Sequence, residues 1–145
     1  MGMLDNNTKF ATAQTVTTLG DTASTDVYDT GNAIGGDIAL TENTWLQASV
    51  NTLATSAGAA TLQAVLQDSA DNVTFADVQS GPVTPVASLV VGAVLFQGTP
   101  PVPLRRYVRI AWRVGTAALT AGKFDAYISA GLQRNVARAS GFTVQ

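Results

Sequence analysis

The chain has 145 residues, which suits one domain with a substantial core and no need of a metal or disulfide staple. Charged residues make up 12% of the sequence, against about 25% in ordinary soluble proteins, and cysteine and histidine are both absent. The composition excludes disulfides and thiolate metal sites, and it argues against the usual catalytic triads and zinc sites.

The two signs of charge are separated along the chain, although the formal net charge is only −2. Nine of the ten acidic residues precede Val78, whereas seven of the eight basic residues lie at or after Arg105. Such a separation orients contact with a partner or a second copy, unless folding interleaves the two halves and cancels it. No apolar run approaches the ~20 residues that span a bilayer, so we expect a soluble protein without a membrane partner.

The predicted elements are short strands bounded by turn residues, because threonine, valine and small residues dominate the sequence. We expect an arm at residues 1–10, a β-domain over residues 11–131 and a tail at residues 132–145. The expected strands in the first two thirds of the chain are residues 13–19, 25–28, 44–51, 61–67 and 93–96. All five prolines fall between Pro82 and Pro103, so this stretch should hold edge segments and connections.

Alternation is clearest between Arg105 and Ala130, where two strands flank a loop of Gly, Ala and Thr. With a period of two, the first strand has an apolar face made by Val108, Ile110, Trp112 and Val114. Its opposite face carries Arg109 and Arg113. The second strand repeats the apolar face with Phe124, Ala126 and Ile128. We expect an antiparallel hairpin in which Asp125 pairs with Arg109 or Arg113.

A similar pattern occurs in the first half, where Ser56-Ala57-Gly58 separates two strands as Thr120-Ala121-Gly122 does in the second. Two like hairpins suggest two packed sheets. About six to eight short strands without helical periodicity predict an all-β fold, a jelly-roll-like antiparallel β-sandwich.

Three short motifs are better explained by turns than by chemistry. Asp29-Thr30-Gly31 has the tripeptide of aspartic proteases, but Asn32 follows and no supporting apolar-Gly-Arg segment exists. Residues 31–36 lack the glycine spacing and the lysine of phosphate-binding loops. Asp68, Asp71 and Asn72 offer too few oxygens at the right spacing for Ca²⁺. We therefore predict no catalytic, cofactor-binding or metal-binding residue, and no enzyme.

Basic and aromatic residues are interleaved at Arg105, Arg106, Tyr107, Arg109, Trp112 and Arg113. Trp112, however, shares its face with the apolar residues, and the protein is acidic, with a sequence pI near 4.7. We expect a cationic face that meets water or a protein, and no nucleic-acid partner.

Three segments occur in the order found in one known family: AGAATLQAVLQD (57–68), YVRIAWRVGTAALTAGKF (107–124) and GFTV (141–144). In these segments the chain resembles the jelly-roll capsid cement proteins of tailed bacteriophages. The resemblance implies a non-catalytic decoration protein on the outer surface of the virion head. Its implied partners are the major capsid protein and other copies of itself, as a homodimer or homotrimer.

Candidate partner contacts lie on the cationic strand and at the two ends of the chain: Leu4, Phe10, Arg105, Arg106, Arg109, Arg113, Arg134, Arg138 and Phe142. The alternative is a jelly-roll carbohydrate-binding module. That function requires Tyr28, Trp45 and Tyr127 to be exposed together.

Overall fold

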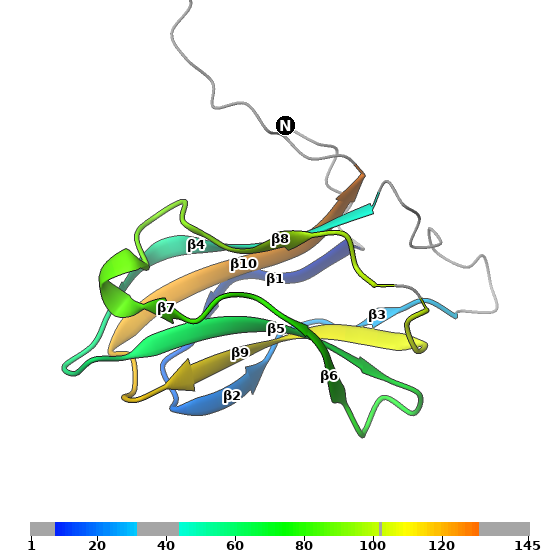
Figure 1. The fold of residues 1–145 in the computed structure, drawn as a ribbon, viewed down its shortest axis with the longest axis horizontal. Helices are drawn as coiled ribbons and strands as arrows, with labels where there is room; N and C mark the ends of the chain where they lie inside the picture. Colours follow the sequence, from blue (N-terminus) through cyan, green and yellow to red (C-terminus); the bar gives the residue numbers. More distant parts are fainter. Residues whose placement is uncertain (1–7, 32–43, 102, 131–145) are drawn as a thin grey trace, which may run out of the picture.

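The computed structural model describes residues 8–31, 44–101 and 103–130. Leu4, Arg134, Arg138, Phe142 and the expected tail at 132–145 lie outside these residues. The described chain folds into two antiparallel sheets that pack face to face (Figure 1). Among the described residues, no helix is long and apolar enough to cross a membrane.

The first sheet, sheet A, has four strands. Their order across the sheet is β1 (Lys9–Thr15), β10 (Ala121–Ala130), β4 (Thr44–Thr55) and β8 (Val94–Gly98). The long strands β4 and β10 occupy its centre, and β8 is one edge.

The second sheet, sheet B, has six strands. Its main order is β2 (Gly20–Ala23), β9 (Tyr107–Gly115), β5 (Thr61–Ser69) and β6 (Ala76–Ser80). Two short strands extend it, since β3 (Tyr28–Asp29) pairs with β9 and β7 (Thr84–Pro85) pairs with β5. A 3₁₀ turn, η2 (Val86–Ser88), follows β7.

The path of the chain is that of a jelly roll. Among the eight main strands, every connection crosses from one sheet to the other except the one between β5 and β6. This wrapping of antiparallel strands over two sheets is the double Greek key of jelly rolls. The prediction of an all-β sandwich of two packed sheets is confirmed.

The predicted hairpin between Arg105 and Ala130 is wrong. β9 pairs with β2, β3 and β5 in sheet B, whereas β10 pairs with β1 and β4 in sheet A. Residues 116–120 therefore connect two strands that face each other across the core. The segment after β4 likewise joins β4 in sheet A to β5 in sheet B.

The two similar segments of the sequence, around Ser56 and around Thr120, form neighbouring connections between the sheets that contact each other. The Ser56 hydroxyl donates to the Ala118 carbonyl at 2.7 Å, and the hydroxyls of Thr55 and Thr120 are 2.8 Å apart. Because β4 pairs with β10 and β5 pairs with β9, the two like segments lie one upon the other.

The core lies between the sheets, and its largest fully buried side chain is Trp112. The alternating residues of β9 are all buried, as are those of β10: Val108, Ile110, Trp112 and Val114, with Phe124, Ala126 and Ile128. The rings of Trp112 and Phe124 meet across the core with centroids 5.4 Å apart. The indole N–H donates to Gln14 Oε1 at 3.1 Å, which satisfies its polar atom. The predicted faces of these strands are confirmed.

The N-terminal part of the fold differs from the prediction. β1 begins at Lys9, inside the expected arm, and Phe10 is fully buried in the protein's own core. Phe10 is thus not available as a partner contact, because its ring already fills the space between the sheets. β2 occupies Gly20–Ala23, between the expected strands at 13–19 and 25–28, and β6 was not predicted at all.

A bulge in β1 explains the position of Asp125. Pairing of β1 with β10 shifts register around Ala13, whose φ of 46° lies in the left-handed region. The Ala13 N–H donates to Asp125 Oδ1, and the Asn51 side-chain amide donates to Asp125 Oδ2 at 2.9 Å. The predicted pairing of Asp125 with Arg109 or Arg113 is wrong because these residues lie in different sheets.

Candidate interaction surfaces

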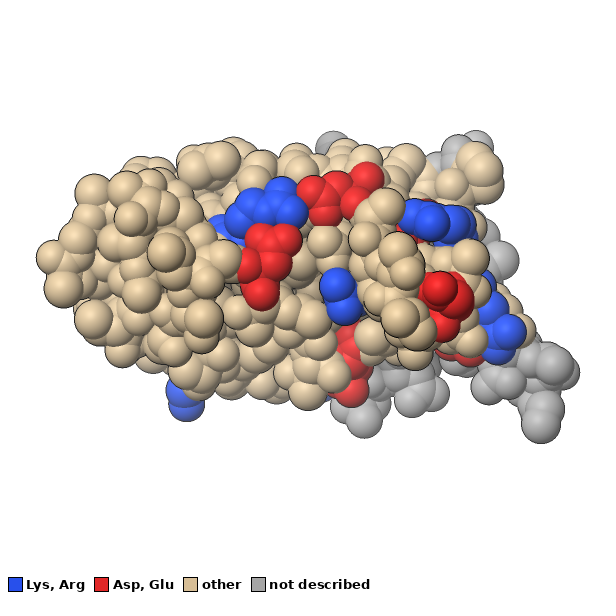
Figure 2. Space-filling model, turned by 90° about the horizontal axis from the view of Figure 1, so that it is seen from below, with Lys and Arg blue, Asp and Glu red and all other residues tan. Residues whose placement is uncertain are grey.

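The outer face of sheet B carries a hydrogen-bonded network of charged and amide side chains, which we call the charged face: Asp21, Gln67, Asp77, Arg109 and Arg113. Strand register builds it, because Asp21 stands opposite Arg113 while Gln67 stands opposite both Arg109 and Asp77. Figure 2 shows acidic and basic side chains intermingled over this side of the molecule, and one end free of charge.

Two apolar residues are buried beneath this face. Val65 and Ala111 are opposite each other in register and share the outward parity, yet both are buried. Their neighbours in the same register are the pairs Gln63–Arg113 and Gln67–Arg109. Long side chains of this kind shield apolar surface with their hydrocarbon stems.

Arg113 is held by two carboxylates. Its Nε and Nη2 donate to the two oxygens of Asp21 at 2.7 and 2.8 Å, and Nη2 also donates to Asp77 at 3.0 Å. The hydrogen bonds that Arg113 donates to Asp21 and Asp77 raise its pKa above the ordinary value. The pKa of Asp77 is lowered, first by the hydrogen bond from Gln67 and also by Arg113.

Arg105 and Arg106 are also paired within the chain. Arg105 Nη2 lies 2.6 Å from the buried carboxylate of Asp68, and its backbone N–H donates to the same group. Burial raises the pKa of Asp68, but the hydrogen bonds from Arg105 outweigh burial and the net shift is downward. Arg106 binds both oxygens of Asp29 at 2.8 and 2.9 Å.

Asp29 therefore has a structural role in a turn. The hydrogen bonds from Arg106 and from the Gly31 N–H lower its pKa, so the carboxylate is charged and occupied. An aspartic protease needs a carboxylate that shares a proton with a second carboxylate. The Asp29 carboxylate has instead a lowered pKa and a guanidinium as its partner.

Asp71 organises the turn between β5 and β6. Its Oδ1 accepts hydrogen bonds from the N–H groups of Val73 and Thr74 and from the Ser69 hydroxyl, at 2.8–2.9 Å. The backbone donors lower its pKa to about 2. The carboxylate thus ties down its own loop, as the predicted turn requires.

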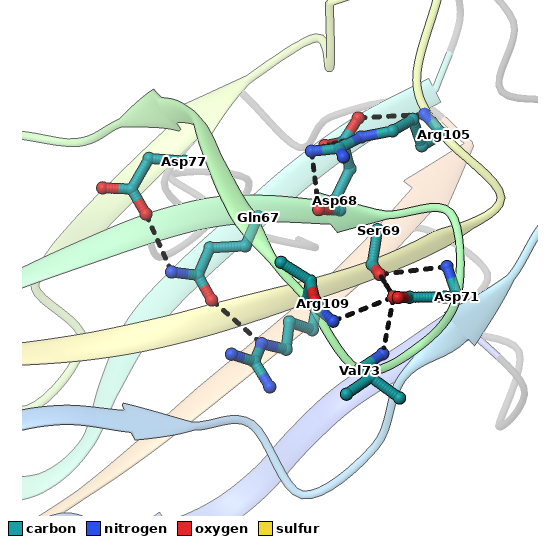
Figure 3. Close-up of polar contacts among 9 residues, drawn as sticks. Gln67, Asp68, Ser69, Asp71, Val73, Asp77, Arg105 and Arg109 are labelled. Carbon is teal, nitrogen blue, oxygen red and sulfur yellow. Dashed lines mark hydrogen bonds and ion pairs between the residues drawn. The ribbon is translucent and has the colours of Figure 1, made fainter.

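Arg109 differs from the other three arginines. Its Nε donates to Gln67 Oε1 at 2.9 Å, and its guanidinium carbon lies 3.7 Å from the centroid of the Phe75 ring. The Gln67 amide in turn donates to Asp77 at 2.8 Å, which fixes the orientation of its oxygen (Figure 3). Within residues 8–31, 44–101 and 103–130, no carboxylate forms an ion pair with Arg109.

Folding thus cancels the charge separation seen along the chain. Carboxylates from the first half pair with arginines from the second half across 36 to 92 residues of sequence. Among the described residues, three of the arginines expected to bind a partner are engaged by the chain's own carboxylates: Arg105, Arg106 and Arg113.

A second surface was not predicted from the sequence. Four exposed aliphatic side chains lie along one edge of sheet A, the apolar edge: Leu53, Val90, Val91 and Val94. Residues 89–93 run beside β4, since Ala54 N–H donates to Leu89 O at 3.2 Å and Val50 N–H donates to Ala93 O at 2.9 Å. Val94 continues the edge opposite Ser49.

The sequence did contain a signal for this surface. No charged residue occurs between Asp77 and Arg105, and two adjacent valines interrupt a run of small residues and prolines. Val91 is 66% exposed and Val90 is 50% exposed, so the pair is not part of the core. Large exposed apolar patches on monomers mark contact surfaces.

The aromatic residues do not assemble the groove that a glycan-binding module requires. Tyr28 is buried in the core, whereas Trp45 and Tyr127 are partly exposed on sheet A. Register places Trp45 opposite Ser129 and Tyr127 opposite Gln47, so these two share the outer face without Tyr28.

Acidic side chains are also dispersed. In the part of the chain that the structure describes, no group of three or more Asp, Glu, His or Cys side chains is placed to hold a metal ion.

Comparison with known proteins gives a family. No curated protein matches the chain. The model of the Bbp16 family matches residues 10–128, which cover nearly all of the described sandwich. The chain belongs to the Bbp16 family.

Proposed function

We propose that this protein is a capsid cement, or decoration, protein that binds the outer surface of a tailed-phage head and stabilises contacts between major capsid subunits. The observation that carries the proposal is the apolar edge, Leu53, Val90, Val91 and Val94. Exposed aliphatic side chains next to an edge strand promote aggregation of a free protein. In an assembled protein the same side chains are buried against a partner and stabilise the contact.

Three further points support the proposal. The segments 57–68 and 107–124 that resemble cement proteins contain most of β5 and all of β9, the two central strands of sheet B, and the start of β10 in sheet A. The side chains near the apolar edge are short, so little conformational entropy is lost when a partner covers them. Membership of the Bbp16 family covers the same residues.

The test is binding to purified heads that lack the protein. We expect the wild-type chain to bind and to raise the temperature at which the heads lose their contents. The double variant Val90→Ser/Val91→Ser should bind at least about tenfold more weakly, because two buried aliphatic side chains contribute roughly 1.5–3 kcal/mol each.

The matched control is Val73→Ser. Val73 lies in the β5–β6 turn of sheet B and is 81% exposed, so its loss should change neither folding nor binding. Failure of the wild-type protein to bind, or binding that leaves the heads no more heat-resistant, would contradict the cement function.

A further inference from the structure

Arg109 is oriented by its own sheet. Gln67 fixes Nε from one side, and the ring of Phe75 lies against the face of the guanidinium. Asp77 holds the amide of Gln67, so the acceptor cannot rotate away without breaking a second hydrogen bond. The side-chain entropy that binding would otherwise cost is thus already lost in the folded protein.

The two terminal nitrogens of Arg109 donate no hydrogen bond to the described residues. Figure 3 shows the bond from Nε to Gln67 and no contact from the terminal nitrogens to the other residues drawn. Within the described ranges they have no acceptor, although Arg109 is only partly exposed. Burial also lowers its pKa, which indicates that water has already been removed from part of the group.

The groups around Arg109 indicate which kind of ligand its terminal nitrogens would bind. A guanidinium edge presents parallel N–H donors that match the two oxygens of a carboxylate. Asp21 and Asp77 lie on the same face and both pair with Arg113, so the four charges of the face balance while no carboxylate of the described residues contacts Arg109. A nucleic-acid backbone would bring a charge at every phosphate onto a face whose arginines are already balanced by Asp21 and Asp77, whereas a single side-chain carboxylate brings only one.

We infer that Arg109, stacked on Phe75 and braced by Gln67, is a binding site for one carboxylate supplied by an aspartate or glutamate side chain of a protein partner. Under the proposed function, on which this identification of the partner rests, that side chain belongs to a major capsid subunit.

The first experiment does not depend on the proposed function. Protein labelled with ¹⁵N is titrated with sodium acetate, with sodium chloride at equal ionic strength as the reference, and the arginine Nε–Hε signals are followed. The Arg109 signal should shift and saturate, whereas that of Arg106, which Asp29 already occupies, should not move. An Arg109 signal that moves no more than that of Arg106 would overturn the inference.

The second experiment measures binding to undecorated heads. Arg109→Lys keeps the charge and the contact with Phe75 but removes the fork, and it should weaken binding at least about tenfold. Lys123→Gln, which removes an exposed cation in sheet A, is the control and should bind as the wild type does. Equal melting temperatures would show that both variants fold.

The outcomes separate the two proposals. If the wild type binds heads and Arg109→Lys binds equally well, the carboxylate site is wrong and the cement function stands. If acetate shifts Arg109 but the wild type does not bind heads, the site stands and its partner is not the capsid.

Discussion

Trp112 is the residue that most directly joins the two sheets. It is fully buried, meets Phe124 of the opposite sheet and bonds Gln14 through its indole N–H. Trp112→Ala should therefore lower the free energy of unfolding by ~3–5 kcal/mol, because a large cavity remains and Gln14 Oε1 loses one of its two donors. Urea denaturation of the variant measures this, with Val73→Ala as the exposed control. An unchanged midpoint would contradict the assignment of Trp112 to the core.

The ionised carboxylate of Asp71 makes the free energy of unfolding depend on pH below about pH 4. Its pKa is about 2 in the folded protein and 3.8 ordinarily, so its contribution is fully present above pH 3.8 and is lost as the pH falls toward 2. Between these values the unfolded chain takes up a proton that the folded chain does not. The stability difference between wild type and Asp71→Asn should shrink over this window, as measured by urea denaturation from pH 6 to pH 2. A constant difference would show that the carboxylate is not ionised in its loop.

Residue alternation could be predicted from the sequence, but the partners of the arginines could not. The period of two assigned Trp112 to the core and Arg109 and Arg113 to the outer face, because that period is a local property of a strand. The carboxylates that occupy Arg106 and Arg113 are 77 and 92 residues away in sequence. Only the strand register brings them together, so the sequence could not show that Arg109 alone, among the arginines of the described residues, lacks a carboxylate partner.

At the scale of elements, Gly81 marks where the chain leaves β6 and passes close to sheet A. Its N–H donates to Ala64 O at 2.8 Å, and a Cβ at this position would lie 2.5 Å from the carbonyl oxygen of Leu95 in β8. Gly81→Ala should therefore destabilise the fold by about 1–3 kcal/mol through overpacking. Gly98→Ala is the matched control, since a Cβ there meets nothing within 4 Å. Equal melting temperatures for the two variants would contradict this close approach.

Strand positions were easier to predict than strand partners. Loops such as residues 116–120 join strands of one sheet or of two sheets with the same composition, so the hairpin between β9 and β10 was a reasonable but wrong prediction. The distinction depends on whether the two apolar faces lie side by side or face each other. Here Trp112 and Phe124 face each other, and that relation is set by the pairing of β9 with β5 and of β10 with β4.

At the scale of the whole molecule, the two candidate surfaces belong to different sheets. The charged face lies on sheet B, and the apolar edge lies along β4 of sheet A. Substitutions in the two surfaces are therefore expected to act independently, as distant sites without shared partners do. The charge separation that suggested oriented contact with a partner or a second copy is largely neutralised within the described residues, where carboxylates pair with Arg105, Arg106 and Arg113.

The crossing connections of the jelly roll also bear on how the chain reaches this structure. Only β5 and β6 are consecutive main strands that pair with each other; all other ladders between main strands join segments that are distant in sequence. Closing such long loops costs entropy before the contacts between distant strands form and compensate for it. We therefore expect folding in the millisecond-to-second range that is typical of β-sandwiches. Even in the folded protein, Val90, Val91 and Val94 are exposed on and just before β8, an edge strand of sheet A. We therefore expect the newly synthesised chain to be prone to aggregate through the apolar edge, with a yield that depends on temperature and protein concentration during folding.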